Sequence, residues 1–177
     1  MAEARLLVAL ALALAGCDVG AATETGSGDE VVSVHEAGAP SGPRVVAEGD
    51  AFTCTPVKLW DGDGPIQCAE GPKVRLAGIA AREMDGSCSP GHPCPEASAQ
   101  DARDTLAGLL GRTTGTASTG HLLIEGPALQ CLSEGSGKGS RTAAWCVSPD
   151  AGDLSCAMVA SGMAEKWDRY WREEACS

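Results

Sequence analysis

Two arginines and a glutamate have the types and spacing needed for chemistry on a phosphodiester. Arg75 lies inside the apolar run VRLAGIAARE, Glu83 ends that run, and Arg141 follows a loop rich in glycine and serine. A phosphodiester gains charge in its transition state, so cleavage needs cations around the phosphoryl oxygens and a base for the attacking water. Arginine binds phosphate in a bidentate way, and glutamate can be the base. We therefore expect a phosphodiester-cleaving site, although each residue taken alone is more often an ordinary surface charge.

Three further patterns contain residue types that could bind a metal ion or a phosphate. Asp61 and Asp63 stand in the turn sequence DGDG, where aspartate is common because it bonds its own backbone. The spacing of Cys88, His92 and Cys94 has the residue types of a zinc site, but in an exported chain a disulfide is favoured. The run GSGKGS lacks the spacing of a phosphate-binding P-loop, so we assign it no such role.

The elements that must position these residues are mostly strands. Two helices are expected, one beginning at Pro95 and ending near Gly111 and one between Asp153 and Gly162. The aromatic-rich segment 167–171 is also expected to be helical. The expected strands are 52–60, 65–69, 73–80, 121–125 with an extension toward 131, and 141–147. The chain therefore predicts a mainly β domain with helices, in the order β-β-β-α-β-β-α, which is typical of a five-stranded Greek-key barrel of the OB type. A generic α+β domain is the alternative.

Eight of the nine cysteines fall in the second part of the chain, and an even number in an exported protein indicates disulfides. Eight cysteines allow 105 pairings, so the sequence does not fix them. The predicted strand order nevertheless suggests four local bridges across neighbouring strands and loops. These are Cys54–Cys68, Cys88–Cys94, Cys131–Cys146 and Cys156–Cys176.

The N-terminal residues predict export and a membrane anchor. An apolar run too short to span a bilayer follows Arg5 and ends at Cys17, as in a signal peptide. The string LAGC resembles a bacterial lipobox, in which the signal is cut before a cysteine that receives lipid. We expect a signal peptide at 1–16, a lipid-anchored flexible linker at 17–50 and a domain at 51–177. A plain signal peptide with an incidental cysteine is the alternative.

The charge of the chain argues against tight, nonspecific binding of nucleic acid. The net charge is −11, and residues 51–177 alone hold eleven basic and sixteen acidic side chains. Proteins that bind nucleic acid nonspecifically are usually basic, because phosphate contacts supply their affinity. A small local cationic pocket is compatible with this composition.

Five motifs together resemble the staphylococcal-nuclease (thermonuclease-like) family over roughly residues 55–170. They are DGDG (61–64), VRLAGIAARE (74–83), PEASAQDA (95–102), GSRTAAW (139–145) and AMVASGMA (157–164). The resemblance implies an OB barrel and calcium-assisted endonuclease hydrolysis of DNA and RNA. It places Arg75 and Arg141 as phosphate clamps and Glu83 as general base. It also places Asp63 as a calcium ligand with Asp61 beside it.

The sequence departs from the family at several of these positions. Ala80 stands where the family has a second calcium aspartate, Arg82 replaces a proline, and Gly139-Ser140 replaces Tyr-Gly. Asp85 is a nearby carboxylate that nothing in the spacing requires. Two functions follow: an envelope-located, membrane-anchored nuclease acting as a monomer on nucleic acid, or a non-catalytic, disulfide-rich OB module that binds a protein partner or nucleic acid.

Overall fold

Short strands outnumber the helices in this domain, and the computed structural model describes residues 44–176. The strands are β1 (Ala51–Cys54), β2 (Pro56–Leu59), β3 (Ile66–Cys68), β4 (Lys73–Leu76), β5 (Ile79–Ala80), β6 (Arg112–Thr116), β7 (Leu122–Glu125), β8 (Leu129–Ser136), β9 (Thr142–Ser148), β10 (Gly152–Asp153) and β11 (Glu165–Lys166). The helices are α1 (Ala99–Leu110), α2 (Leu154–Ala160) and a 3-10 turn, η1 (Glu173–Cys176). The described part of the chain is therefore mainly β with two α-helices, as predicted.

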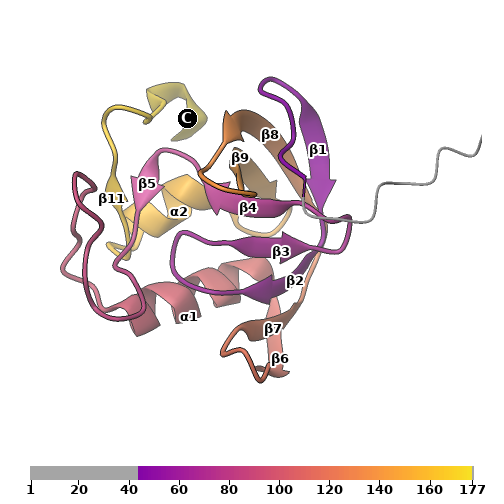
Figure 1. The fold of residues 1–177 in the computed structure, drawn as a ribbon, viewed down its shortest axis with the longest axis horizontal. Coiled ribbons are helices and arrows are strands. Elements are labelled where there is room, and N and C mark those ends of the chain that lie inside the picture. Colours follow the sequence, from indigo (N-terminus) through magenta and orange to yellow (C-terminus); the bar gives the residue numbers. More distant parts are fainter. Residues whose placement is uncertain (1–43, 177) are drawn as a thin grey trace, which may run out of the picture. The chain divides into compact units, whose positions relative to one another are not determined.

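Nine of these strands form one mixed sheet (Figure 1). Its order is β1-β8-β9-β4-β3-β2-β7-β6, with β10 paired to β9, and β5 and β11 form a separate two-stranded sheet. The β4–β9 pair is parallel and aligns Arg75 with Ala143, whereas the other pairs within residues 44–176 are antiparallel. This parallel pairing places the strand of Arg75 beside the start of β9, which directly follows Arg141.

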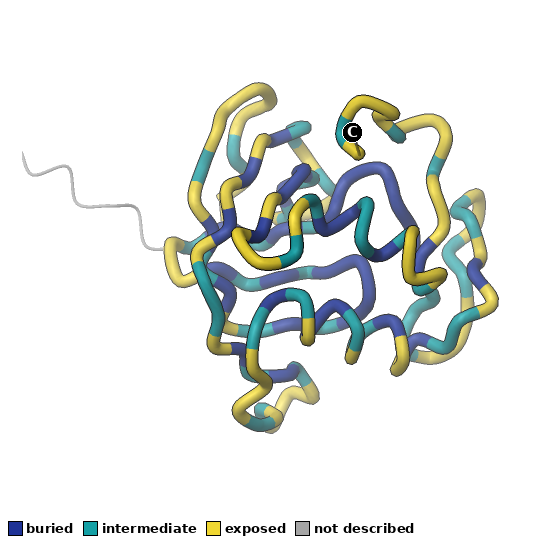
Figure 2. The backbone as a smooth tube through the Cα atoms, turned by 180° about the vertical axis from the view of Figure 1, so that it is seen from behind, coloured by how far each residue is buried: buried dark blue, intermediate teal, exposed yellow. Residues whose placement is uncertain are grey.

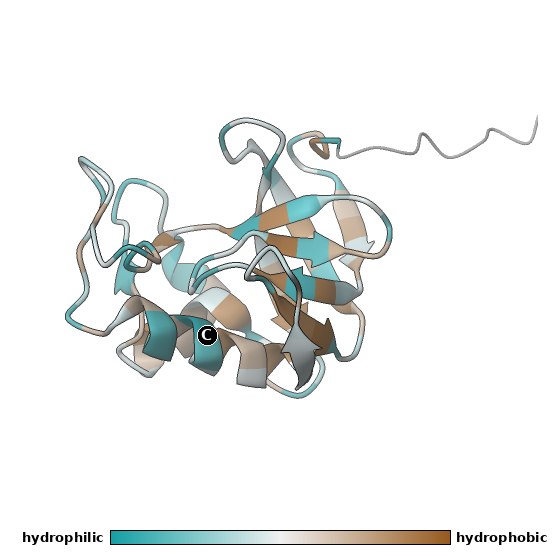
Figure 3. Cartoon of the chain, turned by 60° about the horizontal axis from the view of Figure 1, so that its bottom comes forward, coloured by the Kyte–Doolittle hydropathy of each residue, from teal (hydrophilic) through white to brown (hydrophobic). Residues whose placement is uncertain are grey.

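Helix α1 begins at Ala99, later than the expected start at Pro95, whereas the cap expected at Asp153 is confirmed. The Ser98 hydroxyl accepts a hydrogen bond from the N–H of Asp101, and the Asp153 carboxylate accepts one from Cys156. Apolar side chains of both helices, including Leu106 and Met158, join the strand residues in one buried core. Figure 2 shows the buried backbone gathered in the middle of the domain, and Figure 3 shows alternating hydrophobic and hydrophilic bands along the strands.

All four predicted disulfides are present. Cys54–Cys68 joins the ends of β1 and β3, and Cys131–Cys146 joins directly opposed residues of β8 and β9. The other two bridges lie outside the large sheet. Cys88–Cys94 closes a short loop, and Cys156–Cys176 ties the C-terminal segment to α2.

Several predicted strands are broken or differently placed. The expected strand 52–60 is two strands separated at Thr55, and 73–80 is interrupted at Gly78, where the backbone has φ 73°. Residues 112–116, which lie outside the expected strands, form strand β6, and β8 extends to Ser136 into the expected glycine-rich loop. Each extra strand pairs with a neighbour that the local sequence does not reveal.

The prediction of a helix at 167–171 is wrong. Trp167 donates its backbone N–H to Gly78 O at 2.8 Å, and Tyr170 N–H bonds Trp167 O at 2.7 Å, which makes a turn instead. Contacts with the rest of the domain thus outweigh any local helical preference.

The predicted linker overlaps the folded domain at its end. Val46 N–H bonds Thr142 Oγ1 at 3.0 Å, and Gly49 N–H bonds Ser133 O at 2.9 Å, so residues 46–50 lie against β8 and β9. The predicted signal peptide, Cys17 and the linker up to residue 43 lie outside the described residues. In residues 44–176, no helix is long and apolar enough to cross a membrane.

Candidate active site

The turn that carries Asp61 and Asp63 is held tightly against the sheet. A Cβ on Gly64 would lie 2.5 Å from Val74 O, so only glycine allows the turn to approach β4 this closely. Leu76 N–H bonds Asp63 O at 2.9 Å and fixes the turn beside Arg75. Both aspartates are consequently buried, with 6% and 7% of their surfaces exposed.

Arg75 forms an ion pair with Asp63. Its Nη2 lies 2.6 Å from Asp63 Oδ2, and the same oxygen accepts a 3.3 Å hydrogen bond from Ala81 N–H. Burial of Arg75 opposes its ionisation, but the charge of Asp63 and the hydrogen bond to it outweigh this and raise the pKa of Arg75. Arg75 is therefore a fixed cation, held in one orientation by a buried carboxylate.

Asp61 lies in the same turn without such a partner. Burial and the negative charge of Asp63 raise the pKa of Asp61 to about 8, and the hydrogen bond from Asp63 N–H and the charge of Arg75 only partly oppose this. Asp61 is therefore mostly protonated near neutral pH and adds little negative charge to the site.

Glu83 lies in a tight loop after β5. Its backbone N–H bonds Ser87 O at 2.9 Å, and Gly86 N–H bonds Glu83 O at 2.8 Å. The Ser89 hydroxyl donates to Glu83 Oε1 at 2.7 Å, which orients the carboxylate. The second carboxylate oxygen, Oε2, has no hydrogen bond to another residue in the described chain that would compete with a substrate water.

Arg141 lies in the loop between β8 and β9, two residues before the partner of Arg75. Its Nε donates to Lys138 O at 3.3 Å, and Gly137 N–H bonds Arg141 O at 2.8 Å. Lys138 has φ 77°, which closes the loop tightly. The guanidinium of Arg141 makes no ion pair with a carboxylate in residues 44–176.

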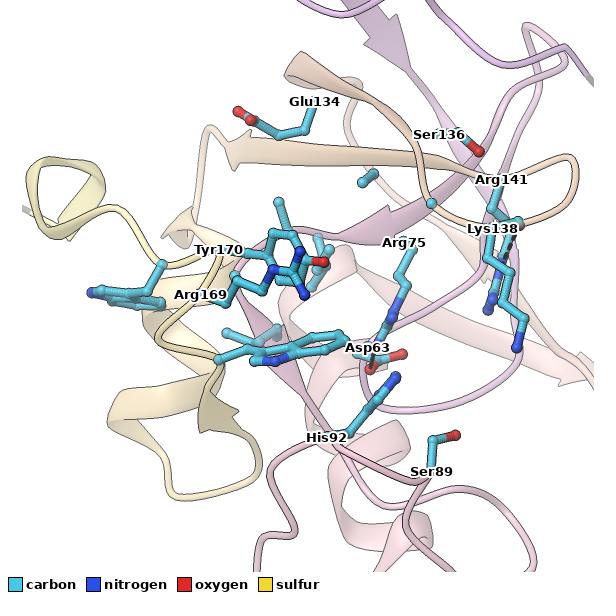
Figure 4. A pocket seen from close by; sticks show the side chains of 18 of the residues that line it. Asp63, Arg75, Ser89, His92, Glu134, Ser136, Lys138, Arg141, Arg169 and Tyr170 are labelled. Carbon is cyan, nitrogen blue, oxygen red and sulfur yellow. Dashed lines mark hydrogen bonds and ion pairs between the residues drawn. The ribbon is translucent and has the colours of Figure 1, made fainter.

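These residues line one cavity of about 650 Å³, which Figure 4 shows from close by. It contains all five predicted site residues, which are Asp61, Asp63, Arg75, Glu83 and Arg141. Figure 4 draws Arg75 between Lys138 and Arg141 on one side and Arg169 and Tyr170 on the other. The fold thus brings together side chains that are spread over 80 positions of the sequence.

The cavity gathers several cationic side chains within an acidic chain. Arg172 pairs with Glu134 at 2.6 Å, as Arg75 does with Asp63, whereas Lys138, Arg141 and Arg169 have no carboxylate partner in the described part of the chain. Three unpaired cations therefore line the cavity together with Glu83 and Glu48. The arrangement favours an anionic ligand.

One wall of the cavity was not predicted from the sequence. Trp167 packs against His92 with ring centroids 4.1 Å apart, and the Arg75 guanidinium lies 5.5 Å from the Trp167 ring. Tyr170 stands edge-on to Trp167 at 4.8 Å. The aromatic content of segment 167–171 was the available signal, but its expected helical geometry gave no reason to direct these rings toward Arg75.

The residues present do not form the calcium site that the resemblance implies. Asp63 is bonded by Arg75, and Asp61 keeps its proton near neutral pH. Ala80 is fully buried and pairs with Glu165, and Asp85 bonds Ser87 N–H outside the cavity. Within residues 44–176, no group of three or more His, Cys, Asp or Glu side chains is close enough to hold a metal ion. Calcium dependence therefore stays a prediction for experiment.

The zinc reading of residues 88–94 is wrong for this structure, because Cys88 and Cys94 are bonded to each other. His92 instead contacts Trp167. Burial and the positive charge of Arg75 lower the pKa of His92, so its ring is largely neutral near pH 7.

Comparisons of the chain with protein-family models, curated proteins and solved structures found no match.

Proposed function

We propose that the cavity binds a phosphodiester of DNA or RNA and hydrolyses it by attack of water. One observation carries the proposal: Arg75, Glu83 and Arg141 line the same cavity, together with further unpaired cations. The Nε–H of Arg75 is also buried without a hydrogen-bond partner among the described residues, which leaves a donor for an anion.

A five-stranded barrel of the OB type is part of this proposal. β1 and β2 are separated only by Thr55, yet β1 pairs with β8 and β2 pairs with β3. If β1 and β2 are counted as one bent strand, the order β1/β2-β3-β4-β9-β8 returns to its starting strand and closes a ring of five. In that ring β4 and β9 are neighbours. Arg75 lies in β4, and Arg141 directly precedes β9, so both arginines lie at the same place on the barrel wall.

The proposed reaction assigns one role to each side chain. The guanidinium groups of Arg75 and Arg141 bind the phosphoryl oxygens, and their charge stabilises the transition state. Glu83 accepts a proton from the attacking water, with its carboxylate oriented by the Ser89 hydroxyl. The phosphorus–oxygen bond to the leaving nucleotide breaks as the bond to water forms.

The test is cleavage of single-stranded DNA, double-stranded DNA and RNA by the full chain, with added calcium and with a chelator. Glu83→Gln should lower the rate by about 10²–10⁴, the usual contribution of a positioned base. Glu96→Gln is the matched control, because Glu96 is exposed and does not line the cavity. Cleavage that is unchanged in Glu83→Gln would refute the assignment of the base.

A second candidate function is binding of nucleic acid or a protein partner without cleavage. The observation that favours it is the Arg75–Asp63 pair, because a substrate phosphate must share Arg75 with a buried carboxylate. This alternative predicts binding of a nucleic acid or protein ligand, weakened by Arg141→Ala, with no cleavage by wild type at any calcium concentration. Arg112→Ala is the control, since Arg112 is exposed, pairs with Glu125 and does not line the cavity.

A further inference from the structure

The four disulfides fall into two classes by accessibility. Cys54, Cys68, Cys131 and Cys146 are all buried, and they join strands of the large sheet. The other two bridges each contain one exposed cysteine, Cys94 in one and Cys176 in the other. A thiol reductant can therefore reach the second class without opening the core.

The Cys88–Cys94 bridge closes the loop that holds the proposed base. This loop contains Ser89, whose hydroxyl bonds Glu83, and His92, whose ring packs on Trp167. The loop is further fixed by Arg82, which donates to Gly86 O at 3.0 Å and to Pro95 O at 2.7 Å. Without the bridge, the loop would keep these contacts of Arg82 and the weaker internal ones, such as the 3.0 Å hydrogen bond from His92 N–H to Ser89 O, but it would lose its covalent closure.

The Cys156–Cys176 bridge fixes the opposite wall. The segment after α2 contributes several side chains to the cavity, which are Trp167, Arg169, Tyr170, Trp171 and Arg172. Strand β11 of this segment pairs with only two residues of β5, and the chain end is tied to α2 by the disulfide. The Arg172–Glu134 ion pair is a further attachment, but Arg172 is exposed, and such pairs are worth little.

The two walls meet at the contact between His92 and Trp167. Each partner of that contact belongs to a segment closed by one accessible disulfide. Loosening either segment removes the contact, and loosening the first also frees Ser89 from Glu83. The geometry of the cavity is therefore held in part by two covalent bonds outside the buried core, together with the hydrogen bond from Trp167 N–H to Gly78 O and the packing of Trp171 against the core.

We propose that the cavity is redox-gated: reduction of Cys88–Cys94 and Cys156–Cys176 by a dithiol releases both walls, while the two buried disulfides keep the barrel folded. A thiolate of the dithiol attacks one sulfur, and the protein S–S bond breaks to give a mixed disulfide. The second thiol of the dithiol then closes its own ring. Each bridge gains two electrons and two protons, and the dithiol becomes a cyclic disulfide. The consequence for cleavage rests on the proposed function, but the release of the walls does not.

The experiment treats the oxidised full chain with dithiothreitol under native conditions, followed by thiol alkylation and mass spectrometry. We expect label on Cys88, Cys94, Cys156 and Cys176 before any on the four buried cysteines. Amide hydrogen exchange should become faster in 82–95 and 163–176 and stay slow in β8 and β9. Label appearing on all eight cysteines together, or unchanged exchange in both walls after selective reduction, would overturn the proposal.

Paired serine variants separate the two bridges. Cys88→Ser/Cys94→Ser should speed exchange in 82–95, and Cys156→Ser/Cys176→Ser should speed exchange in 163–176. If the oxidised protein cleaves nucleic acid, reduction should slow cleavage roughly 10–100-fold, as expected for a misplaced catalytic group. If the oxidised protein cleaves nothing, the proposed function fails, and labelling and exchange still decide whether the walls are redox-gated.

Discussion

Asp61 and Asp63 stand two residues apart in one turn, yet their surroundings give them opposite roles. Asp63 pairs with Arg75, whose Nη2 lies 2.6 Å from its Oδ2, and it holds that guanidinium in place. Asp61 is equally buried but has Asp63 as its main charged neighbour, so its proton is retained to about pH 8. The contrast shows that the role of a buried carboxylate is set by the groups around it and not by its place in the sequence.

Asp61 should make the domain less stable as the pH rises. Its pKa is 3.8 in a model peptide and about 8 in the folded chain, so the folded state binds this proton more tightly than the unfolded state. Its stabilising contribution is full below about pH 4 and is lost as the pH rises toward 8, by up to about 1.4 kcal/mol per pH unit. Asp61→Asn should remove this loss.

Urea unfolding of wild type and Asp61→Asn at pH 5 and pH 8 measures the effect. The advantage of the variant in the free energy of unfolding should be larger at pH 8. An equal difference at both pH values would mean that Asp61 does not titrate as described. Asp150→Asn is a suitable control, because Asp150 is exposed and lies outside the cavity.

The sequence predicted five charged residues that line the cavity, but neither the further cations Lys138 and Arg169 nor the supporting contacts. Arg75, Glu83 and Arg141 could be chosen because phosphate chemistry needs their residue types and the motifs fix their order. Ser89 could not, since a serine in a loop gives no signal of the carboxylate it will bond. The ion pair between Arg75 and Asp63 was not predicted either, because the resemblance implies that Asp63 binds calcium.

At the scale of elements, the sequence predicts features that depend on residues close together in the chain. The cap at Asp153 and the disulfides around single turns depend on neighbouring residues, and they were predicted. The strand β6 and the turn at 167–171 depend on pairing with distant segments. Their sequences carry no pattern that records those partners, so β6 was missed and the turn was predicted as a helix.

The approach of α1 to the acidic turn is set by small side chains. A Cβ added at Gly62 would lie 2.5 Å from Ala102 Cβ and 2.9 Å from Ala81 Cβ. Gly62→Ala should therefore push the helix and the turn apart and lower the free energy of unfolding by about 1–3 kcal/mol. Thermal unfolding measures the loss. In the double variant with Ala102→Gly the clash is removed, so the two changes together should cost less free energy of unfolding than the sum of the two single changes.

Gly108→Ala is the matched control for that prediction. Gly108 lies in the same helix, and an added Cβ there meets nothing within 4 Å. Alanine in an exposed helix position is favoured over glycine, so this variant should gain roughly 0.5–1 kcal/mol. A similar loss in both variants would show that helix packing against the turn is not the cause.

At the scale of the whole molecule, an acidic chain surrounds a cavity with unpaired cations. The net charge of −11 disfavours general adhesion to nucleic acid, and Lys138, Arg141 and Arg169 confine attraction to one place. Disulfides in this domain are compatible with export, as the N-terminal sequence predicts. The lipid anchor itself stays a prediction.

Cys17 should decide whether the chain is held at a membrane. If the chain is cut before Cys17 and lipidated there, the native protein will partition into the detergent phase. Cys17→Ser should leave it unprocessed or release it into the aqueous phase. Phase separation with detergent, followed by mass measurement of the N-terminus, is the measurement. Equal partitioning of the two forms would remove the lipoprotein interpretation.

The placement of the tryptophans makes the cavity optically visible. The chain has four tryptophans and one tyrosine. Trp167 and Trp171 line the cavity, and Trp145 lies 5.5 Å from Trp171, whereas Trp60 packs apart from them against His121. Most of the intrinsic fluorescence therefore originates beside the proposed binding site, and ligand arrival can be followed there without an attached dye.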